Sequence, residues 1–282
     1  MKVPFSKVES IGNDFVLVEA QNLQGIYPSE FAIAACKRHF AIGSDGLLVV
    51  DKAPNGDLLK RMFNPDGTED FCGNGLRCAA VYAVELMGFP NEFTIQHGGK
   101  LIPSRITEKV SDRLHWVETV LPPATFNPLA IPHTLPEPLF NSTLTLGDKN
   151  FPKASAVSTG STHLVLQVDE WPSDETVNTL GPLLEHHPEF PERTSVIWSW
   201  QKNLHSISIR IWERGVGETQ GCGTGSSAAA IVQLRMHNLS GCVEVVNPGG
   251  TVSVTAEDWE SPIKIKGQAR IVYDGVFEIT QN

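Results

Sequence analysis

Residues 72–80 read Cys-Gly-Asn-Gly-Leu-Arg-Cys-Ala-Ala, and residues 222–230 read Cys-Gly-Thr-Gly-Ser-Ser-Ala-Ala-Ala. The two phrases are 150 residues apart, and at the same offset Gly67 matches Gly217. Each phrase is followed by a helix-forming stretch inside sequence that otherwise favours strands. This repeat predicts two halves of similar architecture, each with one cysteine on a glycine-rich turn.

Outside the two phrases, the pattern of apolar residues is mostly that of β-strands. Strands are expected over residues 15–19, 46–51, 59–63, 206–211 and 252–255, with a hairpin over 91–106. Helices are expected over residues 29–40, 76–87 and 226–239, the last two beginning just after a Cys-Gly-x-Gly turn. The proline-rich stretch 122–138 is interpreted as the crossover between halves.

These elements predict two domains. The first comprises residues 1–121 and carries Cys72, and the second comprises 122–268 and carries Cys222. The last strand, 269–280, is expected to return to the first domain, so that residues 269–282 are assigned to it. Whether the strand does return is left open by the sequence.

Composition narrows the class of protein. A chain of 282 residues with 41% hydrophobic and 19% charged residues is typical of a globular protein with two cores. The net charge of −10 and the lack of a basic cluster argue against a nucleic-acid partner. No apolar run resembles an export signal or a membrane span, which favours the cytoplasm. Five cysteines are too sparse for a disulfide framework, so they are expected to remain thiols.

A thiol at the start of a helix is chemically activated. The N-terminus of a helix offers unpaired N–H groups and a partial positive charge, which stabilise a thiolate and lower the thiol pKa. The glycines add N–H groups that can hold a carboxylate. Two such thiols, Cys72 and Cys222, on opposite faces of one α-carbon would invert an amino acid, one removing the proton and the other returning it. This chemistry requires no cofactor and no metal.

The other cysteines and the glycine phrases also have simpler interpretations. Cys36, Cys78 and Cys242 are assigned to packing, because a lone cysteine is usually a small buried apolar residue. The spacing of Cys72 and Cys78 does not match a zinc site, and neither glycine phrase completes a dinucleotide or P-loop motif. A disulfide between Cys72 and Cys222 is a further alternative. The duplication favours the catalytic interpretation.

Several segments resemble the diaminopimelate epimerase family, a group of cofactor-independent amino-acid racemases and epimerases. The matching segments are Ile11-Gly12-Asn13-Asp14-Phe15, the run from Phe63 to Cys78, Pro191-Glu192-Arg193, the run from Glu213 to Gly225, and Tyr273-Asp274-Gly275. Together they extend over nearly the whole chain. The resemblance implies an α+β fold of two pseudosymmetric domains, each a β-barrel-like sheet around a central helix.

The resemblance also implies roles for individual residues. Cys72 and Cys222 would be the acid/base pair, with His163 and Glu213 assisting the thiols. Backbone N–H groups of the glycine phrases would bind the reacting carboxylate, and three side chains would contact the substrate. The implied substrate-binding residues are Gly73, Asn74, Gly223 and Thr224 in the phrases, and Asn13, Asn64 and Arg214 elsewhere. A homodimer is expected from the family alone.

Three positions depart from the family pattern. Ser161 and Ser195 stand where asparagines are expected, and Gly46 stands where a glutamine is expected. All three family residues help to hold the substrate, chiefly its far end. The proton-transfer residues are therefore retained, while the recognition of the side chain has changed.

The leading prediction is an isomerase, diaminopimelate epimerase converting the LL form to the meso form. A racemase for histidine or another basic amino acid is the main alternative, because of the three departures. An isomerase that shifts a double bond in a carboxylic acid, and an inactive amino-acid-binding homologue, are weaker alternatives. The sequence does not identify the substrate, the oligomeric state, the pathway or the direction in which each thiol acts.

Overall fold

The chain forms two units. The structure is a computed structural model that describes residues 1–279, so Thr280, the last residue of the predicted final strand, lies outside the described residues. Unit 1 comprises Met1–Thr119 and the chain from Lys266 onward, and unit 2 comprises Val120–Ile265. The sequence-based boundaries were residues 121/122 and 268/269.

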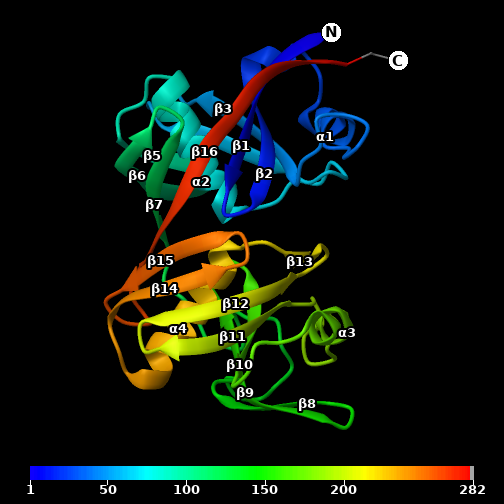
Figure 1. Cartoon of the computed structure of the whole chain (residues 1–282), viewed down its shortest axis with the longest axis vertical. Coiled ribbons are helices and arrows are strands. Elements are labelled where there is room, and N and C mark those ends of the chain that lie inside the picture. The colour runs from blue at the N-terminus through cyan, green and yellow to red at the C-terminus, as the bar shows by residue number, and fades with distance from the viewer. Residues whose placement is uncertain (280–282) are drawn as a thin grey trace. The chain divides into compact units, whose positions relative to one another are not determined.

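Unit 1 is a β-sheet that closes around one helix (Figure 1). Its strand order is β1-β2-β3-β4-β5-β6-β7-β16, and β16 also pairs with β1, so the C-terminal strand does return to the first half. The elements of unit 1 are β1 (Lys2–Ser10), β2 (Asn13–Glu19), η1 (Ala20–Leu23), α1 (Pro28–Ala35), β3 (Gly46–Lys52), β4 (Leu58–Phe63), α2 (Gly73–Leu86), β5 (Glu92–His97), β6 (Lys100–Ser111), β7 (Leu114–Leu121) and the larger part of β16 (Ile263–Glu278).

Unit 2 has a second sheet, also built around one helix (Figure 1). Its strand order is β15-β14-β12-β11-β10-β9-β8, and the short β13 pairs with β12. The elements of unit 2 are β8 (Ser142–Leu146), β9 (Lys149–Ser158), β10 (Thr162–Val168), α3 (Asp174–Glu185), β11 (Ser195–Asn203), β12 (Ser206–Glu213), β13 (Gly217–Thr219), α4 (Gly223–His237), β14 (Gly241–Asn247) and β15 (Gly250–Ala256).

The two units repeat one succession of elements. In unit 1, β2 and β3 are parallel, β3 and β4 antiparallel, β4 and β5 parallel, and β5 and β6 antiparallel. In unit 2 the corresponding pairs are β10 with β11, β11 with β12, β12 with β14, and β14 with β15, with the same orientations. Helix α1 corresponds to α3, and α2 corresponds to α4. The predicted fold class is thereby confirmed.

The central helices α2 and α4 are buried because most of their residues are small or apolar on every face, and the few polar side chains, such as Arg77, are buried with them. Residues 74–83 of α2 and 223–234 of α4 are all buried. Helix α2 packs on β1, β2, β3, β4 and β6, and α4 packs on β9, β10, β11, β12, β14 and β15. Glycine permits this approach: a Cβ added at Gly225 would lie 2.5 Å from Cδ1 of Ile211.

The predicted starts of these two helices were wrong by three residues. Both begin at the first glycine of the phrase, Gly73 and Gly223, rather than after the second glycine. Glycine has a low helix propensity, and tertiary packing overrides it at these positions. The phrase is therefore an N-cap and a first turn, not a turn that precedes the helix.

Two other features differ from the prediction. Helix α1 ends at Ala35 instead of residue 40, and the chain after it turns back so that Gly43 N–H donates to the carbonyl of Ala35. Helix α3 was not predicted at all, although the Ser173 side chain accepts a hydrogen bond from Thr176 N–H, as N-cap residues do. None of the helices in the described part of the chain is long and apolar enough to cross a membrane.

Candidate active site

Cys72 and Cys222 occupy equivalent positions in the two units. Each is the N-cap of its central helix, with φ −139° and ψ 118° at Cys72 and φ −133° and ψ 122° at Cys222. In each helix the carbonyl of the cysteine accepts the first intrahelical bond, from Leu76 N–H at 3.2 Å and from Ser226 N–H at 2.8 Å. Each thiol therefore belongs to a residue at the positive end of a buried helix dipole.

In unit 1, Asn13 joins the thiol to the rest of the sheet. The Cys72 thiol lies 3.5 Å from Oδ1 of Asn13, and Nδ2 of Asn74 donates to the same oxygen at 3.4 Å. The Arg77 guanidinium, which is fully buried, donates to Oδ1 of Asn74 and, through Nε, to Ser10 Oγ at 3.0 Å. Three residues predicted to act together, Asn13, Cys72 and Asn74, are thus in contact.

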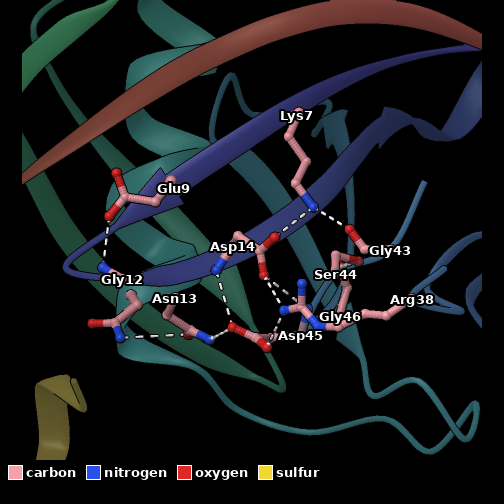
Figure 2. A network of polar contacts seen from close by, with 11 residues as sticks. Lys7, Glu9, Gly12, Asn13, Asp14, Arg38, Gly43, Ser44, Asp45 and Gly46 are labelled. Atoms are coloured by element: carbon pink, nitrogen blue, oxygen red, sulfur yellow. Dashed lines mark hydrogen bonds and ion pairs between the residues drawn. The ribbon is translucent and has the colours of Figure 1, made fainter. Parts of the chain in front are cut away.

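A network of charges holds Asn13 in place (Figure 2). Nδ2 of Asn13 donates to Oδ2 of Asp45 at 2.6 Å, and Arg38 donates to Asp45 at 2.7 Å and to Asp14 at 2.6 Å. Lys7 forms an ion pair with Asp14 at 2.6 Å. Burial raises the pKa of Asp14. The hydrogen bonds and charges of Lys7 and Arg38 have a larger combined effect in the opposite direction, so the pKa lies below its usual value. Because Asp45 accepts from its Nδ2, Asn13 has Oδ1 available for Cys72.

Two of the remaining predicted residues of unit 1, Asn64 and Gly46, are not in this group. Nδ2 of Asn64 donates to Thr68 Oγ1 at 3.1 Å, within the turn that follows β4. Gly46 is the buried first residue of β3, and a Cβ there would lie 2.8 Å from both the carbonyl oxygen of Phe63 and Cε of Met62. Strands β3 and β4 therefore leave no space for the expected glutamine.

In unit 2, hydroxyl groups connect the second thiol to His163. Sγ of Cys222 lies 3.4 Å from Oγ1 of Thr224, and Ser161 Oγ donates to that hydroxyl at 3.2 Å. Ser161 Oγ also lies 3.0 Å from Nε2 of His163. The four predicted residues form a continuous line from imidazole to sulfur, and Ser161 is one of the three departures from the family pattern.

His163 is neutral at physiological pH. Its side chain is fully buried, and burial, together with the charge of Arg214, lowers its pKa to about 3. Nδ1 of His163 has no hydrogen-bond partner among the described residues. An imidazole nitrogen without a proton costs less to leave unpaired than an N–H group, so we assign the proton to Nε2, which then donates to Ser161.

Glu213 is the last residue of β12, and Arg214 follows it directly. Glu213 accepts a hydrogen bond from Thr219 Oγ1. Ser195, a second departure, accepts from Arg214 N–H at 3.1 Å, and the Arg214 guanidinium donates to the carbonyl of Glu192 at 3.2 Å.

Buried Glu185, the last residue of α3, supports this region. It accepts from Gly215 N–H at 2.9 Å and from Trp212 Nε1 at 2.8 Å. The sequence did not single out Glu185, because α3 was not recognised. Asp45, which anchors Asn13, and the buried Lys60 were also missed. Lys60 alternates with Leu58 and Met62, and this period of two would have placed it on the inner side of β4.

One pocket of unit 2 lies apart from these residues. It has a volume of about 470 Å³ and is lined mainly by apolar side chains, among them Leu166, Trp171, Leu180 and Trp198. None of the residues predicted to act in catalysis lines it. The described pocket is therefore a separate feature of unit 2.

Comparisons with known proteins agree with this architecture. A model of the family described as diaminopimelate epimerase matches residues 5–112 and 155–272. A curated diaminopimelate epimerase from Teredinibacter turnerae is 34% identical over 282 residues, covering 98% of this chain and 99% of that protein. One from Caldanaerobacter subterraneus subsp. tengcongensis is 33% identical over 278 residues, again covering 98% and 99%.

A solved structure shares the fold at low sequence identity. It is a phenazine biosynthesis protein of the PhzF family from Bacillus anthracis, with a TM-score of 0.67 and 19% identity, covering 99% of this chain and 100% of that one. The family model spans well over half of the chain, and the curated relatives are about one third identical along nearly all of it. The chain belongs to the diaminopimelate epimerase family, whose members are isomerases.

Proposed function

We propose that this protein is a cofactor-independent epimerase that inverts an amino-acid α-carbon, with Cys72 and Cys222 as its two acid/base groups and diaminopimelate as its substrate. The observation that carries the proposal is the equivalence of the two thiols. Both are N-caps of central helices, their backbone angles agree within 6°, and they lie at matching places in a repeated fold.

In the proposed reaction one thiolate removes the α-proton and the other thiol delivers a proton to the opposite face of the same carbon. Negative charge then develops on the substrate carboxylate. The first-turn N–H groups of α2 and α4 (residues 73, 74, 223 and 224) lie at the positive ends of the two helix dipoles, and we expect them to stabilise such a charge. In the reverse direction the two thiols exchange roles.

His163 is proposed to act on Cys222 through hydroxyl groups. When Nε2–H of His163 donates to Ser161 Oγ, the Ser161 hydroxyl donates to Thr224 Oγ1. The Thr224 hydroxyl is then able to donate to Sγ of Cys222. A donor to the sulfur stabilises the thiolate. Because the pKa of His163 is lowered to about 3, this line of hydrogen bonds stays unchanged across the neutral pH range. Glu213 is proposed to assist from the end of β12.

Two serines favour a second candidate for the substrate. Ser161 is bonded to His163 and Thr224, and Ser195 is bonded to the backbone of Arg214. Both hydroxyls therefore serve contacts within the protein, where the family uses asparagine to hold the far end of the substrate. This favours, as a second candidate, a racemase for histidine or another basic amino acid.

Incubation in deuterated water tests the reaction. LL-diaminopimelate and a panel of L-amino acids are assayed for loss of optical purity and for deuterium at the α-carbon. Inversion of diaminopimelate with deuterium incorporation supports the main proposal, and inversion of a basic amino acid alone supports the alternative. Failure of every substrate would favour the inactive binding homologue, and a requirement for added pyridoxal phosphate would exclude the two-thiol mechanism.

Single substitutions assign the thiols. Cys72→Ser and Cys222→Ser are each expected to lower kcat by at least about 100-fold, because a serine hydroxyl is a much weaker acid than a thiol. Cys242→Ser is the control and is expected to retain activity, because Cys242 is exposed and not, as predicted, a buried packing residue. Inversion that survives in either of the first two variants would remove that cysteine from the mechanism. The cytoplasmic location and the homodimer stay predictions, to be checked by fractionation and by light scattering.

A further inference from the structure

Lys60 is a buried cation that has no role in the proton transfer proposed above. It lies on β4 with its side chain 1% exposed. Nζ donates to the carbonyl oxygen of Cys72 at 3.2 Å, and a Cβ added at Gly75 would lie 3.3 Å from Nζ. The ammonium group is therefore packed against the first turn of α2, immediately below Cys72.

No carboxylate neutralises this cation. Among the described residues, Lys60 takes part in none of the ion pairs, and its other close contact is the ring of Phe71, whose centroid is 5.9 Å from Nζ. The titratable groups around it are Cys72 at the N-cap of α2, Cys78 within that helix, Glu69 and Asp70 before it, and His97 on β5. A second cation, the exposed Lys100, lies over the other contact, the Phe71 ring, at 5.1 Å.

This placement is unfavourable unless negative charge develops nearby. Burying an ammonium group removes its hydration, and burial lowers the pKa of Lys60 to about 8. The N-terminus of a helix is the positive end of its dipole, so a cation there is repelled. Of the surrounding groups, Cys72 has the largest effect in the opposite direction, because a thiolate at that position favours the charged lysine. Since the attraction is mutual, the ammonium group favours the thiolate.

We propose that Lys60 is a positioning residue that favours the ionised form of Cys72 and fixes its backbone at the start of α2. This inference rests on the proposed function in that Cys72 is taken as a reacting group. Lys60 itself acts through Cys72: its hydrogen bond goes to the backbone of that residue, and its charge stabilises the sulfur anion. Lys100 is not expected to affect the ionisation of Cys72, because solvent screens its charge.

Alkylation of Cys72 tests this without any turnover. Wild type, Lys60→Met, Lys60→Arg and the control Lys100→Met are treated with iodoacetamide over a range of pH, and Cys72 and Cys222 are quantified separately by peptide mass spectrometry. In Lys60→Met the pH midpoint for alkylation of Cys72 is expected to rise by roughly one unit, a typical effect of removing a nearby charge. The midpoint of Cys222, and both midpoints in Lys100→Met, are expected to stay at the wild-type values, and Lys60→Arg is expected to restore Cys72.

A folded Lys60→Met protein with an unchanged Cys72 midpoint would overturn the proposal. If Lys60→Met does not fold, the wild-type protein answers the same question by NMR of its ¹⁵N-labelled lysines. Capping Cys72 with methyl methanethiosulfonate removes its negative charge, so the Lys60 titration midpoint is expected to fall; an unchanged midpoint refutes the coupling. Either result is independent of the substrate panel, so failure of the epimerase proposal and failure of this one are distinguishable.

Discussion

Buried His163 is expected to make unit 2 sensitive to acid. Its pKa falls from 6.5 to about 3 on folding, so the folded state holds the neutral imidazole. Above pH 6.5 the ring is neutral in both states and adds no pH dependence. Below pH 6.5 the unfolded chain takes up a proton that the folded chain does not, and stability is lost as the pH falls towards 3. At pH 5 the loss covers 1.5 pH units, which at about 1.36 kcal/mol per unit amounts to ~2 kcal/mol.

The measurement compares urea unfolding of wild type and His163→Gln at pH 7.5 and pH 5.0. Tryptophan fluorescence reports mainly on unit 2, because every tryptophan except Trp116 belongs to it. Wild type is expected to lose ~2 kcal/mol more than the variant between the two pH values, since glutamine does not titrate. Equal losses in the two proteins would show that His163 is not held neutral by burial, and the line of hydroxyl groups to Cys222 would need another explanation.

Three further outcomes are expected. Gly225→Ala, whose new methyl group would lie 2.5 Å from Ile211, is expected to lower the free energy of unfolding by about 1–3 kcal/mol, and an unchanged melting temperature would contradict the close packing of α4. Gly46→Gln, although it restores the family residue, is expected to destabilise unit 1, because its Cβ would lie 2.8 Å from the carbonyl of Phe63; a stable variant with improved activity would refute this. Asp45→Ala is expected to lower kcat at least about 10-fold while leaving the circular dichroism spectrum unchanged, because the amide that faces Cys72 loses its anchor; wild-type kinetics would exclude a positioning role.

The duplicated phrase was enough to predict the repeat, the central helices and the two thiols. The offset of 150 residues places Cys72 and Cys222 at identical points of two matching supersecondary units. The strand at residues 206–211 was also predictable, because its apolar residues recur with a period of two. It is not half-buried as expected, since Ser208 and Arg210 on its polar side are buried as well.

The missing pieces have physical reasons. Helix α3 contains Gly181 and Pro182, which weaken the helical signal, and Gly181 is required there because a Cβ would lie 2.6 Å from the Trp212 ring. Only the packed structure reveals that requirement. The roles of Ser161 and Ser195 could not be predicted from the sequence either, because comparison with the family pattern shows only that an asparagine is absent at each position. The hydrogen bonds to Thr224 and Arg214 show what each serine does instead.

The return of β16 to β1 has a consequence for how the chain is made. Unit 2 is one continuous segment, Val120–Ile265, so all of it is synthesised before the part of β16 that belongs to unit 1. Unit 1 cannot close until that strand pairs with β1, where the amino group of Met1 donates to the carbonyl of Ile279 at 2.6 Å. Unit 1, which carries Cys72, is therefore able to complete its barrel only after the whole of unit 2 has been synthesised.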